Sequence, residues 1–157
     1  MQRILELLDG ARIEYRRIDH EPTRTSEESA RARGAPLRIG GKTLILHHPG
    51  GFAAFVLSAA RKLDSGAVRK HFGTRRLRFA TREELFESTG LVPGCVPPFG
   101  PPVLPFEVYA DPSVLENEQI AFNAGSLTTS IVMATRDWEQ LVCPIVFSFA
   151  EPPDDLA

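Results

Sequence analysis

The chain has 157 residues, of which 43% are hydrophobic and 24% are charged, and this composition predicts one globular domain with a substantial apolar core. No apolar run approaches the roughly 20 residues that a membrane-spanning helix needs, so we expect no membrane partner. Acidic residues interrupt the apolar pattern of residues 1–9, so no signal peptide is indicated and we expect a cytoplasmic protein.

The charge is distributed unevenly along the chain. The net charge is −2, yet residues 61–82 hold eight basic residues and one acidic residue, so this segment carries about +7. A local basic surface on an acidic protein suits a polyanion that is bound at one place. A solvated helix face followed by a charged strand would give the same pattern.

The hydrophobic pattern predicts interleaved helices and strands. In chain order these are a helix over 2–11, a strand over 13–19, a helix over 25–33, strands over 42–47 and 52–57, a helix over 64–72, a strand over 77–80, a helix over 81–90, strands over 106–110, 119–123 and 127–134, and a helix over 135–141. Thr25 is an N-cap candidate and Gly34 ends that helix. Thr81 and Glu84 have the spacing of a capping box.

This order predicts an α/β fold of the mixed α+β kind, because the strands and helices do not follow a strict βαβ alternation. We expect a single domain over residues 1–150, with one strongly curved mixed sheet surrounded by helices. Residues 151–157 are acidic and contain proline, so we expect a flexible tail there.

Residues 91–102 form the least regular part of the chain. Five prolines and two glycines in twelve residues exclude regular structure, and interspersed apolar residues favour an ordered loop. Gly94 would allow the backbone to approach a ligand, and the prolines would leave the remaining N–H groups free to stabilise an oxyanion. A rigid connector is the alternative interpretation.

Lys42 is the second candidate for chemistry. It follows a Gly-Gly pair and begins an apolar strand, where a lysine is either a solvated edge charge or an anchor for a phosphate or carboxylate group. The sequence shows no phosphate-binding loop, and its four histidines lack the spacing of metal ligands, so we expect neither a cofactor nor a metal. Of the two cysteines, Cys143 lies in an apolar run and is interpreted as a small buried hydrophobe.

Short motifs follow one another along nearly the whole chain. They are His20-Glu21-Pro22, Thr25-Ser26-Glu27-Glu28-Ser29-Ala30, Gly41-Lys42-Thr43-Leu44-Ile45-Leu46, Lys62-Leu63-Asp64, residues 77–85, Thr89-Gly90, residues 94–100, Asp111, and Ala124-Gly125-Ser126. In this order and spacing they closely resemble the YbaK/ProX family. That family includes the editing domain inserted in bacterial prolyl-tRNA synthetases and its free-standing relatives.

The resemblance implies the YbaK/aminoacyl-tRNA synthetase-associated domain fold, a partial barrel, and an aminoacyl-tRNA deacylase that edits in trans. Lys42 would bind the phosphate or terminal ribose of the acceptor strand. The Gly94 backbone would hold the aminoacyl carbonyl or the water near it, and Pro98 would brace the loop. Catalysis would be substrate-assisted, with a ribose hydroxyl of the terminal adenosine helping to activate water.

The resemblance also implies substrate-binding and tRNA-binding residues. The substrate-binding candidates are His20, Thr43, Cys95, Val96, Gly125 and Ser126, and the tRNA-binding candidates are Arg61, Lys62, Arg69, Lys70, Arg75 and Arg76. The expected partner is the acceptor end of aminoacyl-tRNA, with a synthetase or an elongation factor as further candidates. Thr43 and Ser126 depart from some members of the family, so alanine, serine, threonine, cysteine and a non-protein amino acid remain open, and tRNA-Pro is one candidate carrier.

Two other functions remain open at this stage. One is a non-catalytic module that keeps the fold and binds tRNA or a synthetase. The other is an esterase for small aminoacyl compounds, which the basic 61–82 segment disfavours because such a substrate is not a polyanion.

Overall fold

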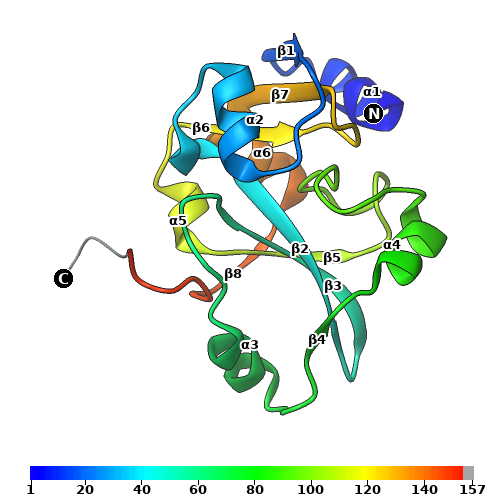
Figure 1. The fold of residues 1–157 in the computed structure, drawn as a ribbon, viewed down its shortest axis with the longest axis vertical. Coiled ribbons are helices and arrows are strands. Elements are labelled where there is room, and N and C mark those ends of the chain that lie inside the picture. The colour runs from blue at the N-terminus through cyan, green and yellow to red at the C-terminus, as the bar shows by residue number, and fades with distance from the viewer. Residues whose placement is uncertain (154–157) are drawn as a thin grey trace.

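A computed structural model describes residues 1–153, and Figure 1 shows how its elements are arranged. The elements are α1 (Gln2–Gly10), β1 (Tyr15–Asp19), α2 (Ser26–Arg33), η1 (Leu37–Ile39), β2 (Gly41–His48), β3 (Gly51–Ser58), α3 (Ser65–Phe72), β4 (Arg78–Phe79), α4 (Arg82–Thr89), β5 (Glu107–Ala110), α5 (Pro112–Leu115), β6 (Gln119–Asn123), β7 (Thr129–Ala134), α6 (Thr135–Val142) and β8 (Ile145–Val146). Most of the predicted tail, from residue 154 onward, lies outside the described residues.

The prediction of a single mixed α+β domain is confirmed, but the described strands form two sheets where one was expected. An antiparallel sheet has the order β1-β7-β6, and a mixed sheet has the order β4-β2-β3-β5-β8. A parallel bridge between Gly40 and Ala121 connects them. Gly41 lies close to this contact, and a Cβ there would lie 2.7 Å from Cδ1 of Ile120, so a larger residue would displace that side chain.

Strand β3 separates two apolar cores. Its residues alternate between the two faces of the sheet, as the period of an extended strand requires. Ala54 and Val56 belong to the larger core between the sheets, which also contains Trp138 of α6. Phe55 and Leu57 belong to a smaller core on the other face, beside α3. The same alternation in β2 directs neighbouring residues at the start of that strand to opposite faces.

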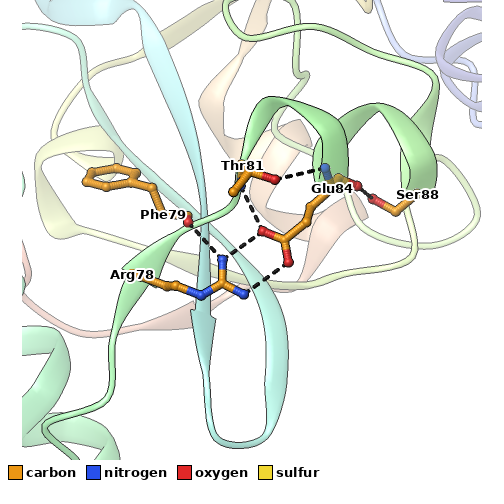
Figure 2. Close-up of polar contacts among 5 residues, drawn as sticks. All are labelled: Arg78, Phe79, Thr81, Glu84 and Ser88. Carbon is orange, nitrogen blue, oxygen red and sulfur yellow. Dashed lines mark hydrogen bonds and ion pairs between the residues drawn. The ribbon is translucent and has the colours of Figure 1, made fainter.

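The predicted helix caps are present. Thr25 accepts a hydrogen bond from the backbone N–H of Glu28, and Gly34 ends α2 in the left-handed conformation. Thr81 and Glu84 form the predicted capping box at the start of α4. Figure 2 shows that the Glu84 carboxylate also receives two hydrogen bonds from Arg78, so the edge strand β4 is fastened to α4.

Asp111, which the family resemblance singled out, is a structural residue. Its side chain is buried and accepts hydrogen bonds from the backbone N–H groups of Ser113, Phe149 and Ala150. The carboxylate therefore connects the end of β5 to the segment that follows β8.

The prediction for Cys143 was wrong. Its side chain is exposed, and the residue ends α6 with a φ of 50°, in the left-handed conformation. The apolar run that suggested burial is divided at this point between the end of a helix and the short strand β8, so its members do not share one environment.

Candidate active site

A cleft of about 210 Å³ lies where α2, the start of β2, the 91–102 loop and the end of β6 meet. Its lining residues are Thr23, Arg24, Thr25, Ser26, Ser29, Arg33, Gly40, Gly41, Lys42, Thr43, Leu44, Ala59, Gly94, Val96 and Asn123. Among these described residues three are cations and none is an aspartate, glutamate, histidine or cysteine. The cleft is therefore electropositive, and it brings Lys42 and Gly94 together as the sequence predicted.

Lys42 lies at the boundary between this cleft and a second cavity. Its ammonium group donates a 2.9 Å hydrogen bond to the backbone carbonyl oxygen of Arg61. Burial lowers the pKa of Lys42, and the nearby carboxylate of Glu27 partly opposes this shift. An ammonium group has three N–H donors, so the Arg61 carbonyl leaves two of them for a ligand.

Thr43, the residue after Lys42 in β2, also lines the cleft. Its hydroxyl oxygen is buried and has no hydrogen-bond partner among the described residues. A buried hydroxyl without a partner costs free energy, roughly 1–3 kcal/mol, so its presence beside a cleft is informative. The hydroxyl oxygen itself is not exposed in the cleft, so a substrate would have to open access to it before forming a hydrogen bond.

The 91–102 loop is ordered by contacts at both ends. The Gly94 carbonyl oxygen accepts a 2.7 Å hydrogen bond from the side-chain amide of Asn123. The Pro98 carbonyl oxygen accepts a 2.8 Å hydrogen bond from the buried indole of Trp138. Within the described part of the chain, the backbone N–H groups of Gly94 and Val96 have no acceptor. The loop thus offers two unused donors on residues that line the cleft.

A polar network that the sequence did not indicate supports this loop. The Arg33 guanidinium donates to Ser130 Oγ at 2.8 Å and to Asn123 Oδ1 at 3.1 Å, and Ser130 Oγ donates to Asn123 Oδ1 at 3.1 Å. Burial lowers the pKa of Arg33 to about 10. Arg33 lies in the last turn of α2, where a basic residue is ordinary, so nothing in the sequence indicated this network. The network forms because the pairing of β6 with β7 places Asn123 beside Ser130.

Other predicted substrate-binding residues lie around the cleft rather than in its wall. His20 reaches the network from outside, with Nε2 2.8 Å from Ser130 Oγ. Cys95 is 4% exposed, and burial raises the pKa of its thiol, which disfavours a nucleophilic role. Gly125 lies beside the amino terminus, and Ser126 hydrogen-bonds Thr128.

The predicted tRNA-binding residues fall into two groups. Arg61 and Lys62 line the second cavity together with Lys42, next to the cleft. Arg69 and Lys70 lie on α3, and Arg75 and Arg76 are exposed in the loop that follows it. Figure 1 places α3 and this loop at the opposite end of the molecule from α2. The basic segment thus runs from beside the cleft to the far end of the protein.

The described residues were also searched for two other kinds of feature. They contain no group of three or more histidine, cysteine, aspartate or glutamate side chains that could hold a metal ion. None of their helices is both long enough and apolar enough to span a bilayer.

Comparison with known proteins identifies similar sequences and structures. The profile of the aminoacyl-tRNA editing domain matches residues 20–141. The multifunctional Ser/Thr-tRNA deacylase ProXp-y of Escherichia coli K12 is 32% identical over 154 residues, covering 94% of this chain and 91% of that protein. The prolyl-tRNA editing protein ProX of Acetoanaerobium sticklandii is 25% identical over 146 residues, covering 90% and 89%. A crystal structure of a proposed trans-editing enzyme for prolyl-tRNA synthetase superposes with a TM-score of 0.83 at 26% identity, covering 96% of both chains.

Proposed function

The chain belongs to the aminoacyl-tRNA editing domain family, and from this premise we propose that it is a free-standing deacylase that hydrolyses the ester bond of mischarged aminoacyl-tRNA. The observation that carries the proposal is the electropositive cleft lined by Lys42 and by Gly94 and Val96, two residues whose backbone N–H groups have no acceptor among the described residues. Lys42 binds the phosphate or terminal ribose of the acceptor strand. The loop receives the aminoacyl carbonyl.

In the proposed reaction, a water oxygen attacks the carbon of the ester carbonyl, and the carbonyl oxygen takes up negative charge. The N–H groups of Gly94 and Val96 stabilise this oxyanion, and they do so without reorganisation because the loop is already held in place. The bond between the carbon and the ribose oxygen then breaks. The ribose oxygen leaves with a proton that comes from the attacking water, so the products are a free amino acid and uncharged tRNA.

The lining of the cleft supports substrate-assisted activation of the water. None of its described residues is a histidine, cysteine, aspartate or glutamate, so the usual protein bases are not at hand. The vicinal hydroxyl of the terminal ribose lies next to the scissile ester in any aminoacyl-tRNA. We assign the activation of the water to this hydroxyl, with positioning and oxyanion stabilisation supplying most of the rate.

Serine and threonine are the aminoacyl groups that we favour. The relative named as a Ser/Thr-tRNA deacylase is 32% identical along most of this chain, and the unpartnered hydroxyl of Thr43 offers a hydrogen bond to a hydroxylated side chain. The cleft, at about 210 Å³, is smaller than the roughly 300–1,000 Å³ of pockets that enclose drug-sized ligands, so it suits an aminoacyl group and not a whole nucleotide.

A panel of aminoacyl-tRNAs tests the proposal. Serine, threonine, alanine and cysteine are each placed on matched and mismatched tRNAs, including tRNA-Pro, and loss of the ester is followed with and without the protein. We expect seryl or threonyl esters to disappear fastest. A terminal adenosine that lacks the vicinal hydroxyl should give a stable ester even in the presence of the protein.

Lys42→Ala tests the assigned anchor. Losing a hydrogen bond to a charged group corresponds to a decrease of about 10–100-fold in kcat/KM. Arg31→Ala is the control, because Arg31 is an exposed cation on α2 that does not line the cleft. The proposal fails if no ester is lost faster than in buffer, and tRNA binding without hydrolysis would instead identify the non-catalytic binding module.

A further inference from the structure

Arg33 is a cation at the wall of the cleft that is held only by neutral acceptors. Its two hydrogen bonds go to Ser130 Oγ and Asn123 Oδ1, and no carboxylate in the described part of the chain forms an ion pair with it. A partly desolvated cation without a counter-charge is unfavourable for folding. Such an arrangement beside a cleft is therefore expected to have a role in the site.

Arg33 determines the orientation of the Asn123 amide. A guanidinium group only donates hydrogen bonds, so the amide oxygen of Asn123 must face Arg33. The amide nitrogen then faces the Gly94 carbonyl oxygen, to which it donates at 2.7 Å. The opposite orientation would bring the amide nitrogen against the guanidinium and the amide oxygen against a carbonyl oxygen. Two repulsive contacts thus exclude it.

The result is a peptide group that is fixed at both ends. Asn123 holds the carbonyl oxygen of Gly94, and the N–H of the next residue, Cys95, donates to the Val92 carbonyl oxygen at 3.3 Å. Because the peptide group is planar, these two contacts restrict rotation on either side of it. Gly94 has a φ of +95°, and glycine by itself resists rotation least of all residues. An external contact is therefore needed to keep the donors of this loop in one arrangement.

We propose that Arg33 and Asn123 are positioning residues of the deacylase, with Arg33 orienting the Asn123 amide and the amide holding the Gly94 peptide in its reactive arrangement. This inference rests on the proposed function. Neither residue has to touch the substrate in this role. The effect should appear in the rate of the chemical step and not in the affinity for tRNA.

Asn123→Asp is the most informative substitution. A carboxylate keeps the one acceptor oxygen that Arg33 and Ser130 share and adds an ion pair with Arg33, so the fold should be retained or stabilised. Its other oxygen faces the Gly94 carbonyl oxygen, where an attractive contact becomes a repulsive one. We expect kcat to fall about 100-fold, the loss that follows from a misplacement of about 1 Å, with KM changed less than about threefold. The melting temperature should stay equal or rise.

Arg33→Lys tests the hydrogen-bond geometry of the Arg33 side chain separately from its positive charge. Lysine preserves the positive charge, but its ammonium cannot reproduce the two hydrogen bonds that a guanidinium makes in a fixed geometry. We expect kcat to decrease as it does in Asn123→Asp. The matched control is Arg31→Lys on the same helix, because Arg31 is exposed and makes no contact with the network. This control should keep wild-type kcat.

Amide hydrogen exchange supplies a readout that does not depend on activity. The Cys95 N–H should exchange faster in Asn123→Asp than in the wild-type protein, because the peptide loses its second attachment. A folded Asn123→Asp variant with wild-type kcat and unchanged Cys95 exchange would overturn the inference and leave the proposed function intact. Wild-type kcat in Arg33→Lys would overturn the role of Arg33. A wild-type protein that hydrolyses no aminoacyl-tRNA would overturn the proposed function itself, whatever the exchange experiment gives.

Discussion

The indole nitrogen of Trp138 donates a 2.8 Å hydrogen bond to the backbone carbonyl oxygen of Pro98. Trp138 is fully buried in the larger core, so this contact attaches the 91–102 loop to that core. The loop is thus held at Pro98 by the core and at Gly94 by Asn123. The bracing role of Pro98 itself stays a prediction.

Trp138→Phe should weaken both the fold and the loop. The substitution leaves the Pro98 carbonyl without its donor and opens a small cavity, so the free energy of unfolding should fall by about 2–4 kcal/mol in urea titrations. The value of kcat, measured well below the melting temperature, should fall about tenfold if small displacements of the loop matter.

The control for this substitution is Phe149→Leu, in the smaller core on the other face of β3. It removes buried volume without a contact to the loop. Phe149→Leu should therefore lower the free energy of unfolding while kcat is unchanged. An equal loss of kcat in both variants would show that general destabilisation, and not the Trp138–Pro98 contact, controls the rate.

Thr43→Val tests whether the unpartnered hydroxyl beside the cleft is kept for the substrate. Removing a buried hydroxyl that has no partner should raise the free energy of unfolding by about 1 kcal/mol. If the hydroxyl binds a serine or threonine side chain, kcat/KM for these esters should fall about 10-fold, while hydrolysis of an alanyl ester should change little. Stability and competitive hydrolysis of mixed substrates are the two measurements.

The chain contains its own matched control. Thr135 has the second buried hydroxyl without a partner among the described residues, and it lies at the start of α6, outside the cleft. Thr135→Val should be stabilising in the same way and leave kcat/KM at its wild-type value. Identical kinetic behaviour of the two variants would remove Thr43 from the substrate site.

Arg75→Gln combined with Arg76→Gln tests the far end of the basic segment. If both arginines contact phosphates, the slope of log K against log salt for tRNA binding should become shallower by about 1.4–1.8. A control pair, Arg16→Gln with Arg136→Gln, removes two exposed cations outside the 61–82 segment. A change of slope that is no greater than in this control pair would exclude Arg75 and Arg76 from the interface.

The features that the sequence predicted well are those determined by neighbouring residues. The caps at Thr25 and Thr81 depend on side chains within three positions, and the irregular 91–102 loop follows from its prolines and glycines. Lys42 and Gly94 were singled out from local patterns and from a family resemblance, and their roles stay predictions. Their presence in one cleft agrees with that prediction.

The features that the sequence missed depend on distant parts of the chain. Arg33 meets Ser130 across 97 residues and Asn123 across 90, and the contact exists only because β6 pairs with β7. The environment of Cys143 was misjudged for a different, local reason, since an apolar run does not show where a helix ends within it. The division of the strands into two sheets, like the Arg33 contacts, depends on which distant strands pair, since β1 pairs with β7 and β3 pairs with β5.

Glu84→Gln should change how stability responds to acid. The Arg78 guanidinium, which donates to the Glu84 carboxylate at 2.7 and 3.0 Å, and the backbone N–H of Thr81 lower the pKa of Glu84 from 4.5 to about 2 (Figure 2). A carboxylate with a lowered folded-state pKa stabilises the fold above the unfolded-state pKa, and this contribution is lost as pH falls toward about 2. The wild-type protein should therefore be the more stable above about pH 4.5, and its advantage over Glu84→Gln should shrink between about pH 4.5 and 2.

Melting temperatures measured across this pH range give the comparison. Glutamine can still accept the hydrogen bond from Thr81 in a capping box, so the helix cap survives and the substitution isolates the contribution of the charge. Glu83→Gln is the control, because it removes an exposed carboxylate from the same turn of α4 without a contact to Arg78. The difference in melting temperature between Glu84→Gln and the wild type should change more across that range than the difference between Glu83→Gln and the wild type. A Glu84→Gln difference that stayed constant would mean that the Arg78–Glu84 pair does not hold the carboxylate ionised in the folded protein.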